Sequence, residues 1–491
     1  MQTAATVAAE PAPDVTYPLV EWSQRLSWNA LPAATRAMVR NELLDYLGAA
    51  IAGRAVAGVP PWLQVLIDMG GRPDAAVLGG PKLPAPTAAL CNGYYGHVLE
   101  MDDTHDEAVL HAGAATIPAV LAVAGLRAQQ GKPVSGQDVC AAILVGIEVT
   151  CRLGVATRLN LVEGGWIYTA LLGHFGATLA ATRILGASPA ATRHALGIVY
   201  CLASGNHQST REGASTKHVQ PGFAAANAVL AALMAGAGLD GVRAPITGED
   251  GLNRVYLRDR FDVERATADL GTRFEIDRLS FKPYPTCRLT HPAISAALQL
   301  HATLDGQTDR LDRIELIIGP QAHDVVGRAT PERLTPVTRV AAQFSVQWTV
   351  AVALAHGAVT PRQLLAEIPP SARVKALIAR IECRADAAAG DATRDVGGCT
   401  LRAHGPSGTR EVRETNAKGH PDNPLSEAEL LAKFTANVAL AGVGSGDATA
   451  LAQQILGLDG ATDVAPLLTR LQAISTATAV LHQPPPETRH V

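Results

Sequence analysis

An acidic segment at residues 100–111 (EMDDTHDEAVLH) places five carboxylates and two histidines within twelve positions. It separates two mostly apolar stretches, residues 87–99 and 112–124, so it lies where one buried helix is expected to end and the next to begin. Carboxylates that neighbour one another raise each other's pKa, and a histidine within reach exchanges a proton near neutral pH. Polar groups held between core helices are typical of a functional site. We therefore expect proton-transfer chemistry at this segment.

Two other interpretations of the acidic segment remain open. Short polar side chains also cap helices on solvated loops, which needs no chemistry. Aspartate and histidine are in addition metal ligands, but the sequence has no HExxH or other fixed ligand spacing. The position between two apolar stretches favours a functional site over a solvated cap, and we predict no metal.

Lys217 and His218 precede an apolar helix that is expected to begin at Gly222. A cation at the start of a helix opposes the helix dipole, so this placement is unfavourable unless an anion is bound there. The alternative is an exposed lysine, because lysine side chains mostly lie in solvent.

A second group of cations, Lys282, Arg288 and His291, lies in or just after the proline-stiffened segment 281–285 (FKPYP). Arginine grips a carboxylate at two points and lysine supplies a point charge, so cations on a rigid strip suit an acidic ligand. The alternative is a solvated basic loop. A turn-rich loop at residues 418–424 (KGHPDNP) has no chemical signature of its own.

Together these segments offer groups for proton transfer and several cations, without a catalytic nucleophile. The sequence has no GxSxG element, and none of its seven cysteines stands in a catalytic or zinc-binding signature. The most economical interpretation is removal of a proton next to a carboxylate, on a small acid that carries several carboxylates. The cations would then stabilise the enolate-like charge that develops.

Length and charge exclude several classes of protein. The chain has 491 residues, enough for two or more domains. Its net charge is −4, and no basic run is long enough to follow a nucleic-acid backbone. No leader with a cationic start and no uninterrupted apolar window of about 18 residues is visible. The odd number of cysteines, without a pairing pattern, is typical of reduced thiols. We expect a cytoplasmic protein that binds neither nucleic acid nor a membrane.

Helical periodicity dominates the chain. Aromatic residues make up only 4% of it, which favours closely packed helices over a sandwich or barrel. We expect helices at residues 37–51, 87–99, 112–130, 138–158, 170–185, 189–203, 222–238, 341–355, 427–440, 448–456 and 462–475. Strands are expected at residues 313–318, 379–384, 399–404 and 409–415, the last two joined as a hairpin.

This distribution of helical periodicity and strand-like alternation predicts a mostly α fold, in which a large all-helical domain is interrupted by a smaller α+β domain. We expect the helical domain at residues 15–273, the α+β domain at 274–415 and the return to the helical domain at 416–483. Residues 1–14 and 484–491 are expected to be loose tails. Two domains joined by two chain crossings create a cleft and a hinge.

Four ordered motifs resemble those of the MmgE/PrpD family, over roughly residues 20–475. They are the DDTH block with the His-Ala-Gly that follows it, Thr216-Lys217, the FKPYP segment and the KGHP of the later loop. The family includes 2-methylcitrate dehydratase, cis-aconitate decarboxylase and iminodisuccinate epimerase. The resemblance implies that the α+β domain is a lid, that the protein is a homodimer, and that it uses no metal or organic cofactor.

The resemblance also assigns roles to single residues. Asp102, Asp103 and Thr104 match the acidic block of the family, and His111 matches the histidine that follows it. Lys217 matches one of two active-site lysines, and Lys282 matches the other.

Two positions depart from the pattern of the decarboxylase-like members. Ile167 fills the slot of a further histidine that carries a proton, and Trp348 fills the slot of a lid tyrosine. Glu100 stands near a position where some members have aspartate. The missing proton could come from His105, Tyr168 or His218.

We predict a lyase that removes water or CO₂ from a small di- or tricarboxylic acid. The predicted catalytic residues are His111, Lys217, Asp102, Thr104 and Lys282. The predicted substrate contacts are Asp103, His105, Tyr168, His218, Arg288, His291 and Trp348. Two alternatives remain: an epimerase or isomerase of a polycarboxylic (amino) acid that uses the same proton abstraction, and a non-catalytic binding homodimer.

Overall fold

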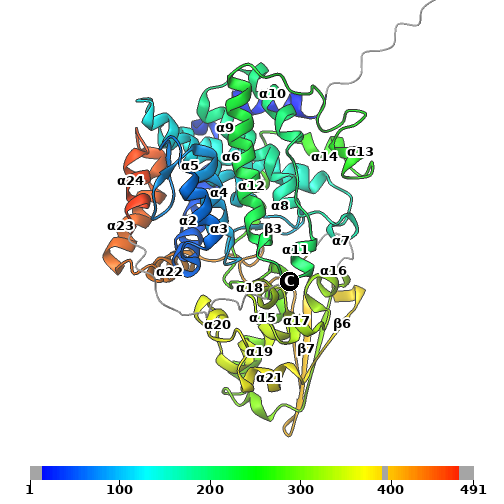
Figure 1. The fold of residues 1–491 in the computed structure, drawn as a ribbon. Coiled ribbons are helices and arrows are strands. Elements are labelled where there is room, and N and C mark those ends of the chain that lie inside the picture. Colours follow the sequence, from blue (N-terminus) through cyan, green and yellow to red (C-terminus); the bar gives the residue numbers. More distant parts are fainter. Residues whose placement is uncertain (1–13, 390–395, 475–491) are drawn as a thin grey trace, which may run out of the picture.

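Helices form most of the computed structural model, which describes residues 14–389 and 396–474. In Figure 1 the helices of the first half of the chain and of its C-terminal part fill the upper region, and a smaller unit with a sheet lies below them. This confirms the predicted fold class, a mostly α fold with a smaller α+β region. The exact boundaries predicted near residues 273 and 415 stay predictions.

Seven helices form the core of the upper region. They are α2 (Ala33–Ala57), α4 (Ala85–His97), α5 (Gly113–Gln129), α6 (Gly136–Ala156), α9 (Gly173–Leu185), α10 (Pro189–Tyr200) and α12 (Thr216–Gly236). Helix α12 packs against α4, α5, α9 and α10, and α6 packs against α9. A Cβ atom on Gly93 of α4 would lie 2.7 Å from the Cα atom of Gly222 on α12. Glycine therefore allows the close contact of the two helices that carry much of the site.

Short helices and strands connect these core helices. The helices are α1 (Thr16–Arg25), α3 (Pro61–Met69), α7 (Leu161–Gly164), α8 (Tyr168–Leu171), α11 (Gln208–Arg211), α13 (Leu252–Val255) and α14 (Val263–Thr267). The strands β1 (Ala75–Ala76) and β2 (Lys82–Leu83) form an antiparallel pair. Asp14 had been assigned to a loose tail, but its carboxylate is buried and accepts hydrogen bonds from the backbone N–H of Ile246 and Thr247. The rest of that tail, and the whole of tail 484–491, lie outside the described residues.

The smaller unit contains a four-stranded sheet in the order β6-β5-β7-β8. Its strands are β5 (Arg313–Ile318), β6 (Ile381–Ala385), β7 (Cys399–Gly405) and β8 (Gly408–Glu414). Strands β5 and β6 are parallel, and β7 and β8 form the predicted antiparallel hairpin. The helices of this unit are α15 (His291–Thr303), α16 (Pro320–Ala322), α17 (Pro331–Leu334), α18 (Arg339–Gln343), α19 (Val346–His356), α20 (Pro361–Ala366) and α21 (Ala372–Ile378). Helix α15 packs against β7, β8 and α19.

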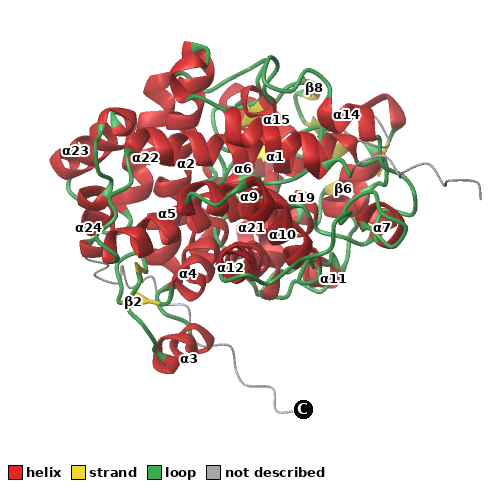
Figure 2. Cartoon of the chain, turned by 90° about the horizontal axis from the view of Figure 1, so that it is seen from above, coloured by secondary structure: helices red, strands yellow, loops and turns green. Residues whose placement is uncertain are grey.

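Three C-terminal helices return to the upper region. Helices α22 (Glu427–Ala439) and α23 (Ser445–Leu456) pack against α2, and α24 (Ala465–Ala473) packs against α5. Figure 2 shows them together along one side of the molecule. Ser426 caps α22: its hydroxyl accepts the N–H of Glu429, whose carboxylate accepts the N–H of Ser426.

Several expected helices differ in their bounds; α2, for example, begins four residues before and ends six residues after the expected range 37–51. The helix expected at 341–355 is two helices, because Ser345 separates α18 from α19 and caps α19 by accepting the N–H of Trp348. Helix α12 begins at Thr216, six residues before the expected start, and contains Pro221. Lys217 therefore lies in the first turn of α12, not ahead of it.

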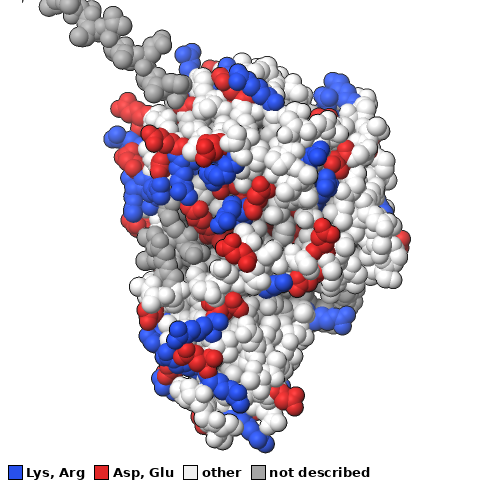
Figure 3. All heavy atoms as spheres, turned by 180° about the vertical axis from the view of Figure 1, so that it is seen from behind, with Lys and Arg blue, Asp and Glu red and all other residues white. Residues whose placement is uncertain are grey.

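Two helices, α6 and α12, are long and apolar enough to cross a membrane by length and composition alone. The apolar window of α6 is completely buried inside the protein, and that of α12 is 61% buried. Their apolar character is therefore largely used for packing between helices. On the face shown in Figure 3, the coloured basic and acidic side chains lie interspersed.

Candidate active site

The acidic segment is a loop between α4 and α5 that pairs with a distant part of the chain. Strand β3 (Thr104–His105) pairs antiparallel with β4 (Leu279–Ser280), so Thr104 faces Ser280 in the register. This pairing places the acidic segment beside the FKPYP segment, and therefore brings the predicted carboxylates to the predicted cations. The loop has two left-handed residues that are not glycine, Glu100 (φ 54°) and Val109 (φ 52°). Such strained backbone is common at functional sites.

Glu100 joins the two predicted lysines. One of its carboxylate oxygens accepts a hydrogen bond from Lys217, and the other lies 3.2 Å from Nζ of Lys282. Lys282 also lies 3.6 Å from Oδ1 of Asp102, and all four side chains are buried. Burial lowers the pKa of both lysines, and their mutual repulsion lowers that of Lys217 further. The cluster therefore holds two ammonium groups that release a proton more readily than a lysine in water.

His97 connects Lys217 to Asp102. Its Nδ1 donates a hydrogen bond to Oδ2 of Asp102 at 2.6 Å, and its Nε2 accepts one from Nζ of Lys217 at 2.7 Å. Burial lowers the pKa of His97 to about 3, so the ring is neutral and the two contacts fix its tautomer. Burial opposes ionisation of Asp102, but His97, Lys282 and His111 lower its pKa overall, so Asp102 is a carboxylate.

His111 is the predicted acid/base residue, and it faces the cavity. Its Nδ1 donates to the backbone carbonyl of Asp103 at 2.6 Å, and its Nε2 lies 4.0 Å from Oε2 of Glu100. Its backbone N–H donates to the hydroxyl of Thr169 at 3.0 Å. Burial, and then Lys282, lower the pKa of His111 to about 4. The ring is therefore neutral near pH 7, with Nε2 able to accept a proton.

Asp103 anchors the loop at the start of α5. Its carboxylate accepts the backbone N–H of Ala112 at 2.9 Å and that of Gly113 at 3.2 Å. Burial, with repulsion from Asp102, raises the pKa of Asp103 to about 8. These contacts hold the turn that carries His111.

The remaining predicted motifs meet at Arg288. Its guanidinium contacts the carboxylate of Asp106 through two nitrogens, at 3.0–3.2 Å, and donates to the backbone carbonyl of Lys418 at 3.1 Å. The hydroxyl of Ser280 also donates to Asp106. The KGHP loop, which had no signature of its own, thus joins the site, and Nε2 of His420 lies 4.0 Å from Asp106.

A cavity of about 70 Å³ lies in front of this cluster. It is lined by Thr104, Val109, His111, Trp166, Ile167, Tyr168, Thr169, His207, Thr210, Lys217, Cys287, Arg288, Leu289, Val325, Phe344 and Val396. The predicted residues Thr104, His111, Tyr168, Lys217 and Arg288 thus share one cavity, whereas Asp102, Asp103 and Lys282 lie behind its wall. Ile167 lines the cavity as well. The position at which the resemblance implies a proton-carrying histidine in the decarboxylase-like members therefore does face the site.

Several predicted substrate contacts lie elsewhere. Trp348 is buried in the smaller unit, where its indole N–H donates to the backbone carbonyl of Glu367 at 3.0 Å. His105 pairs with Glu275 at 3.1 Å, and His291 lies 3.2 Å from the carbonyl of Thr286. His218 is buried behind Lys217, 3.8 Å from Glu100. None of the four lines the cavity, because each side chain is turned into the protein interior.

Two residues of the site, His97 and Glu100, were not among the predicted ones. His97 ends an apolar helix, so its position in the sequence suggests a residue of the hydrophobic core. Only its contacts with Asp102 and Lys217 in the structure indicate its role. Donor atoms of His97, Asp102 and His111 lie within 4.8 Å of one another, close enough to consider a metal ion. However, both ring nitrogens of His97 are already engaged, and the two ammonium groups occupy the space beside the same donors.

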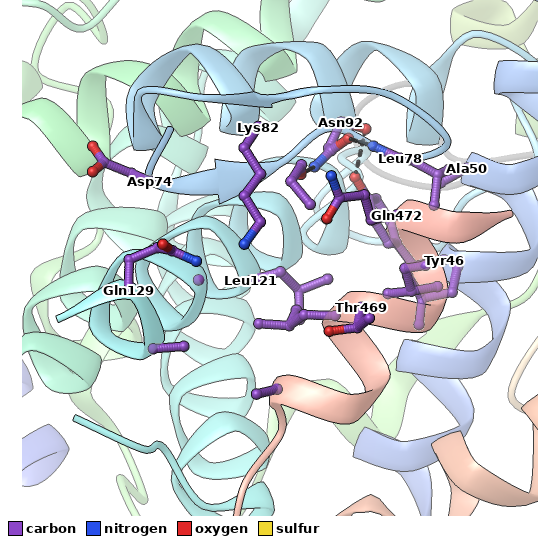
Figure 4. Close-up of a pocket in the computed structure, with 17 residues that line it drawn as sticks. Tyr46, Ala50, Asp74, Leu78, Lys82, Asn92, Leu121, Gln129, Thr469 and Gln472 are labelled. Atoms are coloured by element: carbon purple, nitrogen blue, oxygen red, sulfur yellow. Dashed lines mark hydrogen bonds between the residues drawn. The ribbon is translucent and has the colours of Figure 1, made fainter. Parts of the chain in front are cut away.

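A larger cavity of about 230 Å³ lies away from this cluster, between α2, α5 and α24 (Figure 4). Two of its polar side chains are paired within its wall: the hydroxyl of Tyr46 donates to the carbonyl of Asn92, whose side chain bonds to Ala76 and Leu78. It combines no histidine with a carboxylate, so the smaller cavity is the candidate active site.

Known proteins with similar sequences identify the family of the chain. The chain is 28% identical over 353 residues to cis-aconitate decarboxylase of Aspergillus terreus, covering 69% of this chain and 71% of the relative. It is 27% identical over 404 residues to cis-aconitate decarboxylase of Homo sapiens, covering 80% of this chain and 82% of the relative. Residues 18–264 match the MmgE/PrpD N-terminal domain and residues 284–456 the C-terminal domain. The chain therefore belongs to the MmgE/PrpD family.

Proposed function

We propose that the protein is a lyase that removes water or CO₂ from a small di- or tricarboxylic acid. The observation that carries this proposal is the state of His111: its ring is neutral, its Nδ1 is fixed by the carbonyl of Asp103, and its Nε2 faces a cavity beside Lys217. Family membership and the similarity to decarboxylases support a lyase of the decarboxylase or dehydratase type. The substrate itself is open.

Proton transfer by His111 is the central step of the proposal. In a dehydration, Nε2 of His111 takes the proton from the carbon next to a carboxylate, and the electron pair expels a hydroxyl group that leaves as water after protonation. Lys217 stabilises the enolate-like charge and can supply that proton, because burial lowers its pKa. In a decarboxylation, the C–C bond to the leaving carboxylate breaks, and the ammonium group of Lys217 returns a proton to the carbon.

The lysines supply the positive charge in this scheme. Glu100 keeps Lys217 and Lys282 side by side in a buried site, where charges act more strongly than in water. We therefore propose that the reaction needs neither a metal nor an organic cofactor. Retention of activity after dialysis against a chelator tests this point.

A substrate screen tests the function. Citrate-like, aconitate-like and amino-dicarboxylic acids are each incubated with the protein in heavy water and followed by NMR. Loss of a substrate with formation of an unsaturated or decarboxylated acid supports the lyase. Exchange of an α-proton without a new product supports the epimerase alternative instead, and no change in any acid contradicts both.

The homodimer implied by the resemblance also remains a proposal, as does a cytoplasmic location. A stripe of side chains on α12, formed by Phe223, Leu230 and Met234, is 37–45% exposed and apolar. Such a stripe is a suitable surface for a second copy. Light scattering of the protein and of Leu230→Glu tests it: we expect a dimer that the substitution weakens, and a monomeric wild type would contradict the proposal.

A further inference from the structure

Some of the buried polar atoms without a partner lie at or near the active-site cavity. Among the described residues, Nδ1 of His207, Oγ1 of Thr210 and Nη1 of Arg333 are buried and make no hydrogen bond. The three residues are only 3–7% exposed, and His207 and Thr210 line the same cavity as His111 and Lys217. Unpaired buried polar groups are unfavourable and uncommon in native proteins. Several around one cavity indicate a ligand that pairs with them.

The three side chains come from both parts of the fold. His207 and Thr210 belong to the segment of α11, which is fixed because the N–H of His207 donates to the carbonyl of Gly165 at 2.9 Å. Arg333 lies on α17 of the smaller unit, where its backbone carbonyl accepts the hydroxyl of Ser345 at 2.8 Å. Figure 1 shows α11 directly above the part of the smaller unit that contains α16 and α17.

Arg333 does not itself line the cavity, but it interacts electrostatically with two residues that do, His207 and Cys287. Burial, with repulsion from Arg211 and Arg333, lowers the pKa of His207 to about 4. Burial also lowers the pKa of Arg333, and the largest opposing influence is Cys287, which lines the cavity. A neutral His207 next to an uncompensated guanidinium favours an incoming anion over a cation.

The other cations at the site already have carboxylate partners. Glu100 binds Lys217 and Lys282, and Asp106 binds Arg288 through two nitrogens. Arg333, in contrast, forms no ion pair with any residue that the structure describes. A carboxylate is the chemical group that suits the guanidinium of Arg333 as a partner, because it accepts two hydrogen bonds from a guanidinium.

We propose that His207, Thr210 and Arg333 form a second subsite, which binds a carboxylate of the substrate remote from the reacting carbon. This inference rests on the proposed function and assigns the residues that bind a second carboxylate of its di- or tricarboxylic substrate. One carboxylate lies near His111 and Lys217, and the other accepts hydrogen bonds from the guanidinium of Arg333 and the hydroxyl of Thr210. Monocarboxylic acids of the same length are then poor ligands.

Binding of tricarballylate, a tricarboxylate with no double bond or hydroxyl group to eliminate, tests the subsite by calorimetry. We expect Arg333→Leu to weaken its binding roughly 10- to 100-fold, the range for losing hydrogen bonds to a charged group. Thr210→Val should weaken it several-fold. The matched control is Arg328→Leu, which removes an arginine of the same unit that is 55% exposed and paired with Asp324. The affinity of the Arg328→Leu protein for tricarballylate should stay within about twofold of that of wild type.

A second readout separates binding from a structural role. Arg333→Leu removes a buried charge without a partner, so its melting temperature without ligand should equal or exceed that of wild type. A structural role would lower it. With a substrate from the NMR screen, KM should rise while kcat changes little.

The outcomes distinguish the two proposals. Equal affinity of Arg333→Leu and wild type for tricarballylate overturns the subsite and leaves the lyase intact. Binding that depends on Arg333, with no turnover of any acid, overturns the lyase and leaves the subsite intact. Failure of wild type to bind tricarballylate overturns the subsite as well.

Discussion

Glu100→Gln is the substitution that most sharply probes the buried charge cluster. The glutamine keeps the shape of the side chain but leaves Lys217 and Lys282 without their shared carboxylate. At the 3.2 Å between Oε2 of Glu100 and Nζ of Lys282, two unit charges attract by about 5 kcal/mol at an effective dielectric constant of about 20. Breaking a buried pair by removing one partner typically costs about 3–5 kcal/mol. We expect the free energy of unfolding to fall by that amount.

Urea unfolding of wild type and Glu100→Gln measures this loss. Glu107→Gln is the matched control, because Glu107 lies in the same segment but is 42% exposed and paired with Arg265. Its cost should stay below about 1 kcal/mol. The double variant Glu100→Gln/Lys217→Met should be more stable than Glu100→Gln alone, since one uncompensated ammonium is removed. A Glu100→Gln protein as stable as wild type would refute the account of the cluster.

Four further predictions follow from the geometry. The pKa of His111 is lowered to about 4, so the base form persists on acidification, and the acid limb of kcat/KM against pH should fall near pH 4; a limb near 6.5 would contradict it. The same pKa shift makes the protein less stable in acid, because His111 binds a proton below about pH 6.5 in the unfolded chain but not in the folded one. The free energy of unfolding, measured with urea at each pH, should therefore fall by about 3 kcal/mol between pH 6.5 and 4. The fall should be smaller in His111→Asn. Ile167→His adds a titratable group to the cavity wall and should raise the turnover rate of the acid identified by the NMR screen at least about tenfold; an unchanged rate would mean that no donor is needed there. Gly93→Ala forces α4 and α12 apart, because its Cβ would meet Gly222 at 2.7 Å, and should lower the melting temperature, whereas Gly460→Ala, with no neighbour within 4 Å, should not.

The helices and strands were largely predictable because their hydrophobic periods are regular. The apolar stretches on either side of the acidic segment became α4 and α5, and the alternation at 313–318 became β5. The start of α12 was placed six residues too late, at Gly222, although α12 begins at Thr216 and contains Pro221 within it. The split of α18 from α19 depends on the cap formed by Ser345 within an otherwise apolar stretch.

The residues of the site were easier to predict than their partners. His111, Lys217 and Arg288 stand in recognisable motifs and do line one cavity. Pairs such as Asp106 with Arg288 depend on the β3–β4 pairing, which no local sequence pattern predicts. His97 was missed because it ends an apolar helix, and Trp348 was expected at the substrate because its position, but not the direction of its side chain, can be carried over from relatives.

Proton transfer by His111 is the central claim, and one measurement tests it directly. The acid identified by the NMR screen is incubated in heavy water with wild type, His111→Asn and, as a control, His356→Asn, whose ring pairs with Glu367 outside the cavity. We expect His111→Asn to stay folded, to bind the acid and to lose at least about 100-fold in the rate of product formation and α-proton exchange, while His356→Asn keeps the wild-type rate. A His111→Asn protein that turns the acid over at the wild-type rate would contradict the account.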